Sequence, residues 1–453
     1  MAKVVVIGGG VSGLAAANFL DGMDVTVLEA SAKAGGHVQT ERIEGRIIDR
    51  AANGWLDSEP AMDRMLAKLD LTESIIPASH RASTRWIYAG GQMHAAPLSP
   101  SAFLRSSLLP WWAKLRVMCE PLIPRGRKHV EETVAEFVTR RLGRCFVDKM
   151  VGPMVAGIYA AKPEELSLKA AFPKMAEMER EYRSLFLAML AKKRGGAPSG
   201  HLQTLPSGAG QLVDTMADRL GENLICDTPA EGLTRTQDGW RVHTEGADID
   251  ADAVILAAPA PVQARFLRGL DSNAASALDG ISYAPVTVVV TAWPAGAFDR
   301  SPSGFGVLVA RGERVGVLGT LFTSETYPHQ NKEGEILLRT MVGGAVNPAA
   351  ANLNHQTLLD RVFAAHERFF GTRRAEPTLV RAYHHDSGIP QYTPGHPSRV
   401  AAISAASDRF GGLFFAGNHL KGIGVKDCVA TGERIASDVR GWIEATSPTE
   451  EIK

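Results

Sequence analysis

The sequence lacks the patterns that mark several large classes of protein. Its four cysteines are far apart among 453 residues and form no C-x-x-C pair, so neither a disulfide framework nor a zinc ribbon is predicted. Forty-nine basic residues balance forty-nine acidic ones, which argues against a broad cationic face and a nucleic-acid partner. Nowhere do about 18 apolar residues run together, so no membrane-spanning helix is expected.

Motifs of common hydrolases and kinases are also missing, since no G-x-S-x-G, H-E-x-x-H or P-loop pattern occurs. His384-His385-Asp386 suggests a metal site at first sight. Adjacent side chains of a strand point to opposite faces, however, so these residues cannot easily share an ion and we expect no metal. The N-terminal apolar run has no basic region before it and stops at Gly8, which is typical of a buried strand rather than a secretion signal. A reduced, cytoplasmic protein is the expectation.

The residues that are present indicate a globular α/β protein, because 45% are apolar and 22% charged. Lys3 to Ile7 is a β-branched run, Leu14 to Leu20 has helical spacing and Val25 to Leu28 is a second strand, which together make a βαβ unit. From about Pro97 to Lys193 the strand signals vanish and helical segments take over. Residues 281–342 contain β-branched runs again and predict a separate sheet.

A glycine pattern lies between the first strand and the first helix. In G-x-G-x-x-G, glycine permits a tight turn, lets the backbone approach a pyrophosphate and packs the helix on the strand. Glu29 follows at the end of the second strand, 21 residues after the first glycine, where a carboxylate hydrogen-bonds a ribose hydroxyl. The predicted phosphate turn comprises Gly8, Gly9, Gly10, Val11, Ser12 and Gly13.

One tightly held flavin fits this signal better than a nicotinamide cofactor. No basic residue follows Glu29 directly, which disfavours a 2′-phosphate and therefore NADPH. Other glycine pairs, at 208–210, 304–306 and 422–424, lack the third glycine. The chain is therefore expected to bind a single dinucleotide.

Four segments resemble one family of flavoproteins. Val27 to Gly36 is similar to the flavin-binding start of the group that contains amine oxidases, phytoene desaturases and protoporphyrinogen oxidases. Gly157 to Leu185 resembles the helical domain of the protoporphyrinogen oxidase family, and Gly388 to His396 and Gly417 to Cys428 resemble its C-terminal blocks. The resemblance covers Lys3 to about Gly432. Departures at Ala51-Ala52 and Ala161-Lys162 affect the expected contacts with the isoalloxazine ring.

The resemblance implies an α/β fold of three parts. A discontinuous Rossmann-type FAD-binding domain would comprise residues 1–80, 205–260 and 381–453. A mixed-sheet substrate domain would comprise 81–98 and 261–380, and an all-helical inserted domain 99–204. Carried over by position, the residues that would line the FAD beyond the phosphate turn are Glu29, Ala30, Gly36, His37, Asn53, Gly54, Ala230, Gly417, Ile423, Gly424 and Val425.

The family oxidises a porphyrinogen, a large tetrapyrrole with carboxylate arms, so the resemblance implies a broad apolar pocket with a cation at one edge. Arg85 matches the position that pairs with a propionate, although Arg81 and Lys114 could serve instead. Gly157 matches a glycine whose carbonyl would accept from pyrrole N–H groups, with a merely crowded helix turn as the alternative. The expected apolar wall over the flavin, which could equally be ordinary core, consists of Phe305, Leu308 and Met341.

These resemblances imply an FAD-dependent oxidase that converts protoporphyrinogen IX to protoporphyrin IX in heme biosynthesis, with molecular oxygen as the acceptor. Hydride would pass from a meso carbon to flavin N5. Aromatisation drives the reaction, so no side chain is predicted as a general base. Coproporphyrinogen III remains an alternative substrate, and a related amine or carotenoid oxidase or a flavin-free carrier of prenylated GTPases remain alternative functions. The oligomeric state stays open, a homodimer included.

The helical segment also contains a candidate membrane-contacting surface. Trp111 and Trp112 stand beside Lys114, with Arg127 and Lys128 further on, and tryptophan next to cations suits the headgroup region of a bilayer. The chain would then sit on the inner face of the cell membrane without crossing it. The competing interpretation places both tryptophans in the core or along the substrate entrance.

Overall fold

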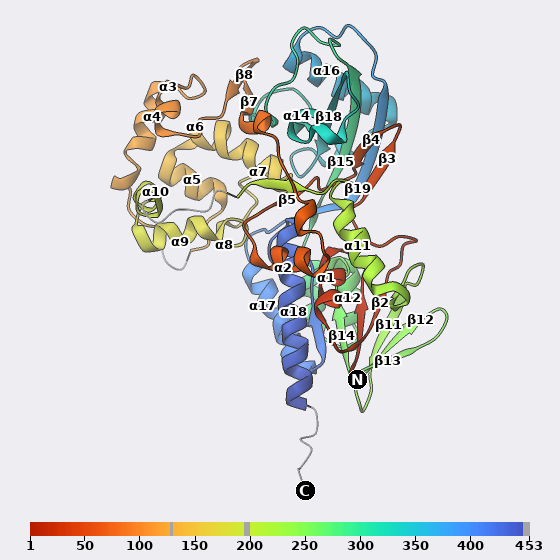
Figure 1. Ribbon diagram of the computed structural model, residues 1–453. Coiled ribbons are helices and arrows are strands. Elements are labelled where there is room, and N and C mark those ends of the chain that lie inside the picture. The colour runs from red at the N-terminus through yellow and green to blue at the C-terminus, as the bar shows by residue number, and fades with distance from the viewer. Residues whose placement is uncertain (127–129, 194–199, 447–453) are drawn as a thin grey trace.

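The computed structural model describes residues 1–126, 130–193 and 200–446, and Figure 1 shows two large sheets flanked by an all-helical part. Arg127 and Lys128 lie outside the described residues. The mixture of sheets and helices confirms the predicted α/β class.

The N-terminal βαβ unit belongs to a five-stranded parallel sheet. Strand β1 (Lys3–Ile7) pairs on one side with β2 (Asp24–Leu28) and on the other with β14 (Ala253–Leu256). Alternate side chains of β1 enter two different apolar cores, because successive residues of a strand point to opposite faces. The sheet is completed by β10 (Leu224–Ile225) beside β2 and β20 (Leu413–Phe415) beside β14.

Helices cover both faces of this sheet. All nine residues of α1 (Val11–Phe19) are buried, and α18 (Val425–Thr446) crosses it closely because Gly432 has no side chain; a Cβ there would lie 2.6 Å from Cβ of Ala15. The same face holds α2 (Pro60–Lys68) and α11 (Gly210–Leu220). The other face holds α12 (Ala260–Leu267), α13 (Ser272–Asp279), α17 (His396–Phe410) and a small sheet of β11 (Ala230–Arg235), β12 (Trp240–Thr244) and β13 (Ile249–Ala251).

The second large sheet is mixed, as predicted, because one of its pairs is parallel. That pair joins β7 (Arg85–Ala89) to β16 (Gly306–Val309), more than 200 residues away in the sequence. The remaining strands are β19 (Leu379–Pro390), β15 (Tyr283–Pro294), β18 (Glu335–Gly343), β17 (Gly319–Phe322) and β8 (Gln92–Ala95), in the order β19-β15-β18-β17-β16-β7-β8. One face packs on α16 (His355–Phe370) beside α15 (Pro348–Ala351), and α14 (Thr323–Thr326) follows β17.

The opposite, inner face of the mixed sheet positions the candidate site. It is covered by the hairpin of β3 (Thr40–Ile43) and β4 (Arg46–Asp49) and by the end of α7 (Gly152–Tyr159). A three-stranded sheet of β5 (Trp55–Leu56), β9 (Leu202–Thr204) and β6 (Ile76–Pro77) lies between the two large sheets in Figure 1.

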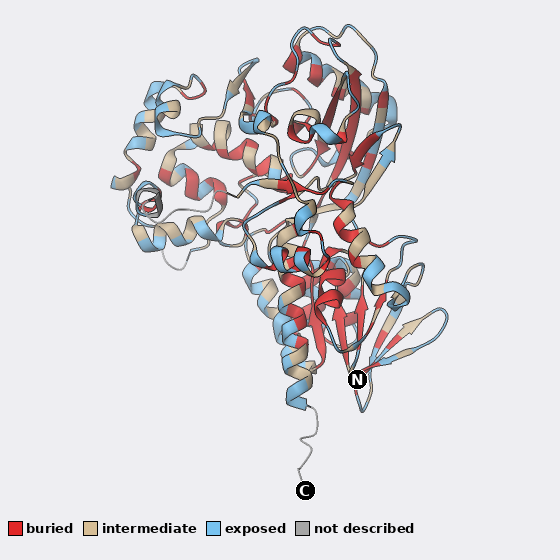
Figure 2. Cartoon of the chain, in the orientation of Figure 1, coloured by how far each residue is buried: buried red, intermediate tan, exposed pale blue. Residues whose placement is uncertain are grey.

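The predicted helical segment contains helices and no strand within the described residues 100–126 and 130–193. Residues 173–193 form two helices rather than one, because Arg183 adopts a left-handed backbone with φ of 64° between them. Figure 2 shows much of α3 and α4 as exposed surface. The helices, besides α7, are α3 (Pro100–Arg105), α4 (Trp111–Met118), α5 (Val134–Leu142), α6 (Arg144–Phe146), α8 (Leu168–Ala171), α9 (Pro173–Tyr182) and α10 (Leu185–Lys193), with a π-helical turn at Val147–Val151.

The predicted division into three domains stays a prediction, but one of its boundaries would cut through a strand. The boundary between residues 380 and 381 falls inside β19, which pairs with β15 from Leu379 to Pro390. Residues 381–390 therefore lie in the mixed sheet and not in the parallel one. The signal that could have found this is the long polar and aromatic strand Leu379–Pro390 itself, which has no dinucleotide motif after it.

Candidate functional site

The glycine turn has the geometry that a phosphate needs. Gly8 has a φ of 113°, and a Cβ on Gly13 would stand 2.0 Å from the carbonyl oxygen of Gly8, so helix α1 can approach β1 only without side chains there. A Cβ on Gly10, by contrast, would meet no atom within 4 Å. The backbone is therefore crowded from within the protein at Gly8 and Gly13 and open at Gly10, where a ligand can come close.

The N-terminus of α1 is also free to bind an anion. No side chain caps the helix at Gly10. The backbone N–H groups of Ser12 and Gly13 donate to no acceptor in the described part of the chain, although both residues are buried. Unsatisfied N–H groups and the helix dipole make such a terminus a binding site for phosphate. This observation supports the predicted role of residues 8–13.

Glu29 occupies the predicted position at the end of β2. Its Oε2 accepts from the backbone N–H of Gly9 at 2.7 Å and its Oε1 from that of Ser31 at 2.9 Å. Each carboxylate oxygen keeps a second lone pair for a ribose hydroxyl. The N–H of Thr228 donates to the carbonyl oxygen of Glu29 at 2.9 Å, which brings the start of β11 with Ala230 alongside. Ala30, next in the chain, is exposed.

The loop of Gly36 and His37 lies against the glycine turn. A Cβ on Gly36 would stand 3.5 Å from Cα of Gly10. Nδ1 of His37 is 3.1 Å from Nδ1 of His385, and its Nε2 is 3.1 Å from the carbonyl oxygen of Ser387. Burial lowers the pKa of both imidazoles, that of His385 to about 4. This pair, which joins residues far apart in the chain, was not predicted.

The side chains of His384 and His385 turn to different partners. His384 turns to Thr287 and Asp386, with Nδ1 2.9 Å from Oγ1 and Nε2 2.8 Å from Oδ1, whereas His385 turns to His37. The two adjacent imidazoles thus face opposite sides of β19. Within the described ranges no group of three or more acidic, histidine or cysteine residues could hold an ion.

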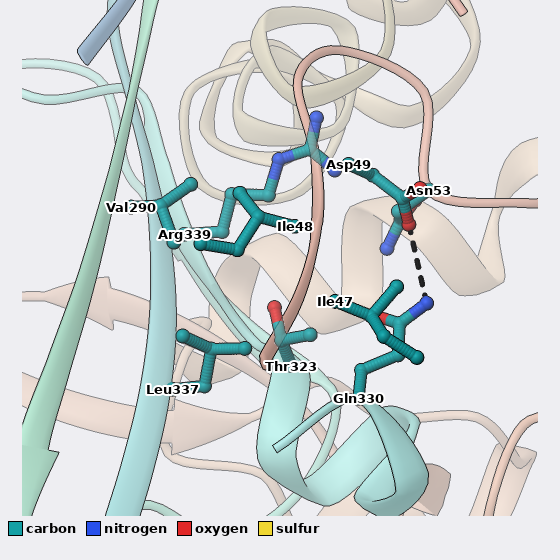
Figure 3. Close-up of a pocket in the computed structure, with 9 residues that line it drawn as sticks. All are labelled: Ile47, Ile48, Asp49, Asn53, Val290, Thr323, Gln330, Leu337 and Arg339. Carbon is teal, nitrogen blue, oxygen red and sulfur yellow. Dashed lines mark hydrogen bonds between the residues drawn. The ribbon is translucent and has the colours of Figure 1, made fainter. Parts of the chain in front are cut away.

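Asn53 and Gly54 lie between the two large sheets. Gly54 has a φ of 152°, and a Cβ there would be 2.4 Å from the carbonyl oxygen of Gln203, so the segment tolerates no side chain. Asn53 lines a small cavity of about 10 Å³, room for one water. Figure 3 shows this cavity, in which Gln330 donates to Oδ2 of Asp49 at 3.2 Å. Burial raises the pKa of Asp49.

Arg339 is a buried cation in the same cavity that the sequence did not reveal. Its guanidinium points toward the segment of Asp49 and Asn53 in Figure 3. It makes no hydrogen bond or ion pair with any residue that the structure describes, and burial lowers its pKa to about 10. No local motif signals this residue, because it stands in an ordinary apolar strand, β18.

The C-terminal residues that were predicted to contact FAD lie at and just before the start of α18. Gly417, with a φ of 142°, follows β20, and the N–H of Gly424 donates to Oδ2 of Asp427 at 3.1 Å. Ile423 packs against the apolar cluster of the helical part, and Val425 begins α18 in the core of the parallel sheet. The structure thereby brings residues 417–425 to the junction of the parallel sheet and the helical part.

The predicted substrate residues lie on neighbouring strands and on α7. Arg85 pairs with Gly306 in the mixed sheet, and its guanidinium carbon is 5.6 Å from the ring centre of Phe305. Leu308 pairs with Gly319, and Gly319 with Met341, so the apolar positions are adjacent across three strands.

A Cβ on Gly157 would lie 2.6 Å from Cδ2 of Leu308, so a larger residue there would require the Leu308 side chain to shift. Helix α7 ends at Tyr159 and Ala160 turns left-handed with a φ of 49°. No backbone N–H of the described residues after the helix therefore closes onto the carbonyl of Gly157. Both interpretations of Gly157 therefore remain open: Leu308 crowds its turn, and its carbonyl has no backbone partner among the described residues.

The alternatives to Arg85 are less well placed. Nζ of Lys114 donates to the carbonyl oxygen of Leu104 at 2.8 Å, within the helical part. Arg81 lies in the 3-10 turn His80–Ser83, ahead of β7. Arg85 itself is exposed and has no ion pair with the described residues, so its charge is available.

Comparisons with known proteins agree with this geometry. The family model of flavin containing amine oxidoreductases matches residues 11–440. A coproporphyrinogen III oxidase of Propionibacterium freudenreichii subsp. freudenreichii is 30% identical, over 98% of this chain and 92% of its own. A protoporphyrinogen oxidase of Bos taurus is 30% identical, over 97% and 98%. A crystal structure from Exiguobacterium sp. 255-15, provisionally named a protoporphyrinogen oxidase, superposes with a TM-score of 0.84 at 24% identity, over 98% of this chain and 99% of that one, and shows the same fold.

Proposed function

The chain belongs to the flavin-containing amine oxidoreductase family and is an FAD-dependent oxidoreductase, and on that premise we propose that it oxidises a porphyrinogen to the porphyrin with molecular oxygen as the acceptor. The relatives named above support a tetrapyrrole substrate and a role in heme biosynthesis. The sequence favours protoporphyrinogen IX and keeps coproporphyrinogen III as the alternative. The observation that carries the proposal is that Arg85, which has no ion pair with the described residues, lies on the same mixed sheet as the apolar positions Leu308 and Met341, with Gly157 beside Leu308.

The residues present fit FAD. Residues 8–13 and the N-terminus of α1 would hold its phosphates, Glu29 the ribose and Ala230 the adenine. Gly36, His37, Asn53, Gly54, Gly417 and residues 423–425 would line the rest of the cofactor. When bound, FAD supplies the redox chemistry by accepting hydrogen from the substrate.

The chain's own residues then bind and orient the macrocycle. Arg85 would pair with a carboxylate arm, because a guanidinium meets a carboxylate with two parallel hydrogen bonds. The carbonyl of Gly157 would accept from a pyrrole N–H. Phe305, Leu308 and Met341 would exclude water from the apolar ring. No residue is assigned a proton-transfer role.

The proposal is tested with the purified holoprotein. A visible spectrum shows whether flavin is bound, and porphyrin fluorescence is then followed after aerobic addition of protoporphyrinogen IX or coproporphyrinogen III. Formation of either porphyrin at a rate proportional to flavin content supports the proposal. If neither porphyrin forms while a primary amine bleaches the flavin spectrum, the chain is an amine oxidase and the proposal is wrong.

Arg85→Ala should lower kcat/KM for the porphyrinogen about tenfold to a hundredfold, because a bidentate charged pair with a carboxylate is lost. The flavin spectrum should stay unchanged, since Arg85 lies away from the phosphate turn. The matched control is Arg81→Ala, four residues earlier. Should Arg81→Ala and not Arg85→Ala reduce the rate, the carboxylate contact belongs to Arg81.

We further propose that the helical part contacts a membrane surface. The tryptophans are not core residues, since Trp111 is 74% and Trp112 55% exposed, which excludes that part of the competing interpretation. Together with Leu104, Leu115, Met118 and Leu122, which are also exposed, they make an apolar patch on α3 and α4 and the turn after them. In the described ranges no helix is long and apolar enough to cross a bilayer.

Trp111→Ala/Trp112→Ala should lower sedimentation with anionic phosphatidylglycerol vesicles by about tenfold at low salt, because two interfacial aromatic anchors are removed. Binding of the parent should weaken in high salt and with neutral phosphatidylcholine vesicles. Ile225→Ala, which alters an exposed apolar residue on β10, serves as the control. A parent protein that stays in the supernatant at low salt would show that the patch does not bind membranes.

A further inference from the structure

A second cavity, of about 680 Å³, opens where α7, the connection from β16 to β17 and the end of β18 meet. Its volume suits a small-molecule ligand. Its walls are partly apolar, with Ala156, Val309 and Leu318, and they also carry four basic side chains against one acidic side chain. The basic residues are Lys162, Arg311, Arg314 and Arg361, and the acidic one is Glu313.

Two of these cations have protein partners. Arg311 forms an ion pair with Glu164 and lies 3.8 Å from Asp148, and Lys162 is 3.0 Å from Glu165. Their charges are therefore already compensated.

Arg314 and Arg361 remain uncompensated. Neither guanidinium makes a hydrogen bond or ion pair with any residue in the part of the chain that the structure describes. Glu313, whose Oε1 accepts from the backbone N–H of Gly90 at 2.5 Å, contributes one negative charge against these two positive charges. Arg361 is half-buried on α16, where an unpaired charge is unfavourable. The cavity thus has an excess of positive charge that an anionic ligand would neutralise.

This cavity borders the proposed substrate site. Ala156 directly precedes Gly157 and packs in the same apolar cluster as Leu318 and Met341. Val309 follows Leu308 but points to the other face of β16, where it packs against the cluster under α16, so the cavity reaches around the end of the mixed sheet. Gly343 is two residues after Met341 and so lies on the same face of β18. Leu318 packs in the apolar cluster that Met341 also contacts. The cavity therefore meets the proposed site at Ala156 and Leu318.

The cavity and Arg85 stand at opposite ends of β16. Arg85 is level with Gly306, the first residue of that strand, whereas the cavity begins at Val309 and continues along the connection to β17. At about 3.3 Å per residue, Ala310 lies about 13 Å further along than Gly306. That separation is comparable to the width of a tetrapyrrole with its side chains.

Resting on the proposed function, we propose that Arg314 and Arg361 bind carboxylate arms of the porphyrinogen at the edge remote from Arg85. The preferred substrate is then the tetracarboxylate, coproporphyrinogen III, rather than the dicarboxylate. Protoporphyrinogen IX carries vinyl groups in place of two of the four propionates. It would place apolar groups against two unpaired guanidinium groups, which disfavours its binding.

The test uses the holoprotein and the double variant Arg314→Ala/Arg361→Ala. For each porphyrinogen we would measure kcat and KM separately, and for each product porphyrin the dissociation constant by fluorescence quenching, which does not depend on turnover. The parent should prefer coproporphyrinogen III. The double variant should lower the ratio of kcat/KM for coproporphyrinogen III to kcat/KM for protoporphyrinogen IX at least about tenfold, by raising KM for coproporphyrinogen III. It should also weaken coproporphyrin binding by a similar factor. Arg265→Ala, an exposed arginine on α12, is the control and should leave the ratio unchanged.

The outcomes separate the two proposals. If the parent oxidises both porphyrinogens and the double variant keeps the parent's preference and coproporphyrin affinity, the carboxylate site is refuted while the proposed function stands. A parent that prefers protoporphyrinogen IX also refutes the carboxylate site. If the parent oxidises neither porphyrinogen, the proposed function fails, and the assignment of this cavity to its substrate fails with it.

Discussion

Gly10→Val is expected to give a folded protein that purifies with less than about a tenth of the parent's FAD. A Cβ at this position meets no protein atom within 4 Å, and the φ of −75° is ordinary for valine, so the chain itself tolerates the substitution. The branched side chain instead fills the space beside the first turn of α1, which the pyrophosphate must enter.

Flavin content is measured from the visible spectrum and from FAD released on denaturation, per mole of chain. Far-ultraviolet circular dichroism checks the fold. Gly269→Val provides a matched control, because Gly269 also has an unrestricted backbone and open space around its Cβ but lies far from the glycine turn in the sequence. Full flavin occupancy in Gly10→Val would mean that the phosphates bind elsewhere.

Arg141→Met is expected to lower the free energy of unfolding by about 3–5 kcal/mol, because it removes one partner of a buried charge network. The side chain of Arg141 is fully buried. Its Nη1 donates to Oε1 of Glu120 at 3.0 Å and its Nε to Oε1 of Glu179 at 2.8 Å. Glu120 is itself 1% exposed and accepts from the N–H of Leu185 at 3.0 Å. The network thus joins α5 to α9, α10 and the turn at Glu120.

Urea unfolding followed by tryptophan fluorescence measures the effect. Arg144→Ala is the control, since its ion pair with Asp148 is exposed and should contribute about 1 kcal/mol or less. The double variant Arg141→Met/Glu120→Leu should recover part of the loss, because the uncompensated buried carboxylate is then also removed. An Arg141→Met protein that unfolds at the parent's urea concentration would contradict a stabilising role for the network.

The local features of the nucleotide site could be predicted from the sequence. The strand, the glycine turn, helix α1 and Glu29 all lie within the first 29 residues, and the structure places them as the spacing predicts. Periodicity and glycine positions encode such units because their geometry depends on near neighbours in the chain. The helical character of the described residues 100–126 and 130–193 was predictable for the same reason.

The interior of the candidate site could not be predicted in this way. The contact of His37 with His385, the cavity shared by Arg339 and Asn53, and the pairing of β7 with β16 join residues that are hundreds of positions apart. Nothing in the local sequence around Arg339 distinguishes it from an arginine on the surface of a strand. Arg339 is buried because the hairpin β3–β4, more than 280 residues earlier in the chain, covers that face of the mixed sheet.

The sequence by itself determined the α/β class, the single glycine fingerprint and the carboxylate beside it. Only the tertiary structure decided which cations are already paired and which remain free, and therefore where an anionic substrate can bind. Arg311 forms an ion pair with Glu164 and Lys114 donates to the carbonyl oxygen of Leu104, whereas the guanidinium groups of Arg85 and Arg361 have no hydrogen bond or ion pair with the described residues. The physical reason is that an ion pair depends on distance in space, which is set by the packing of whole sheets and helices, whereas a turn or a helix depends on distance along the chain.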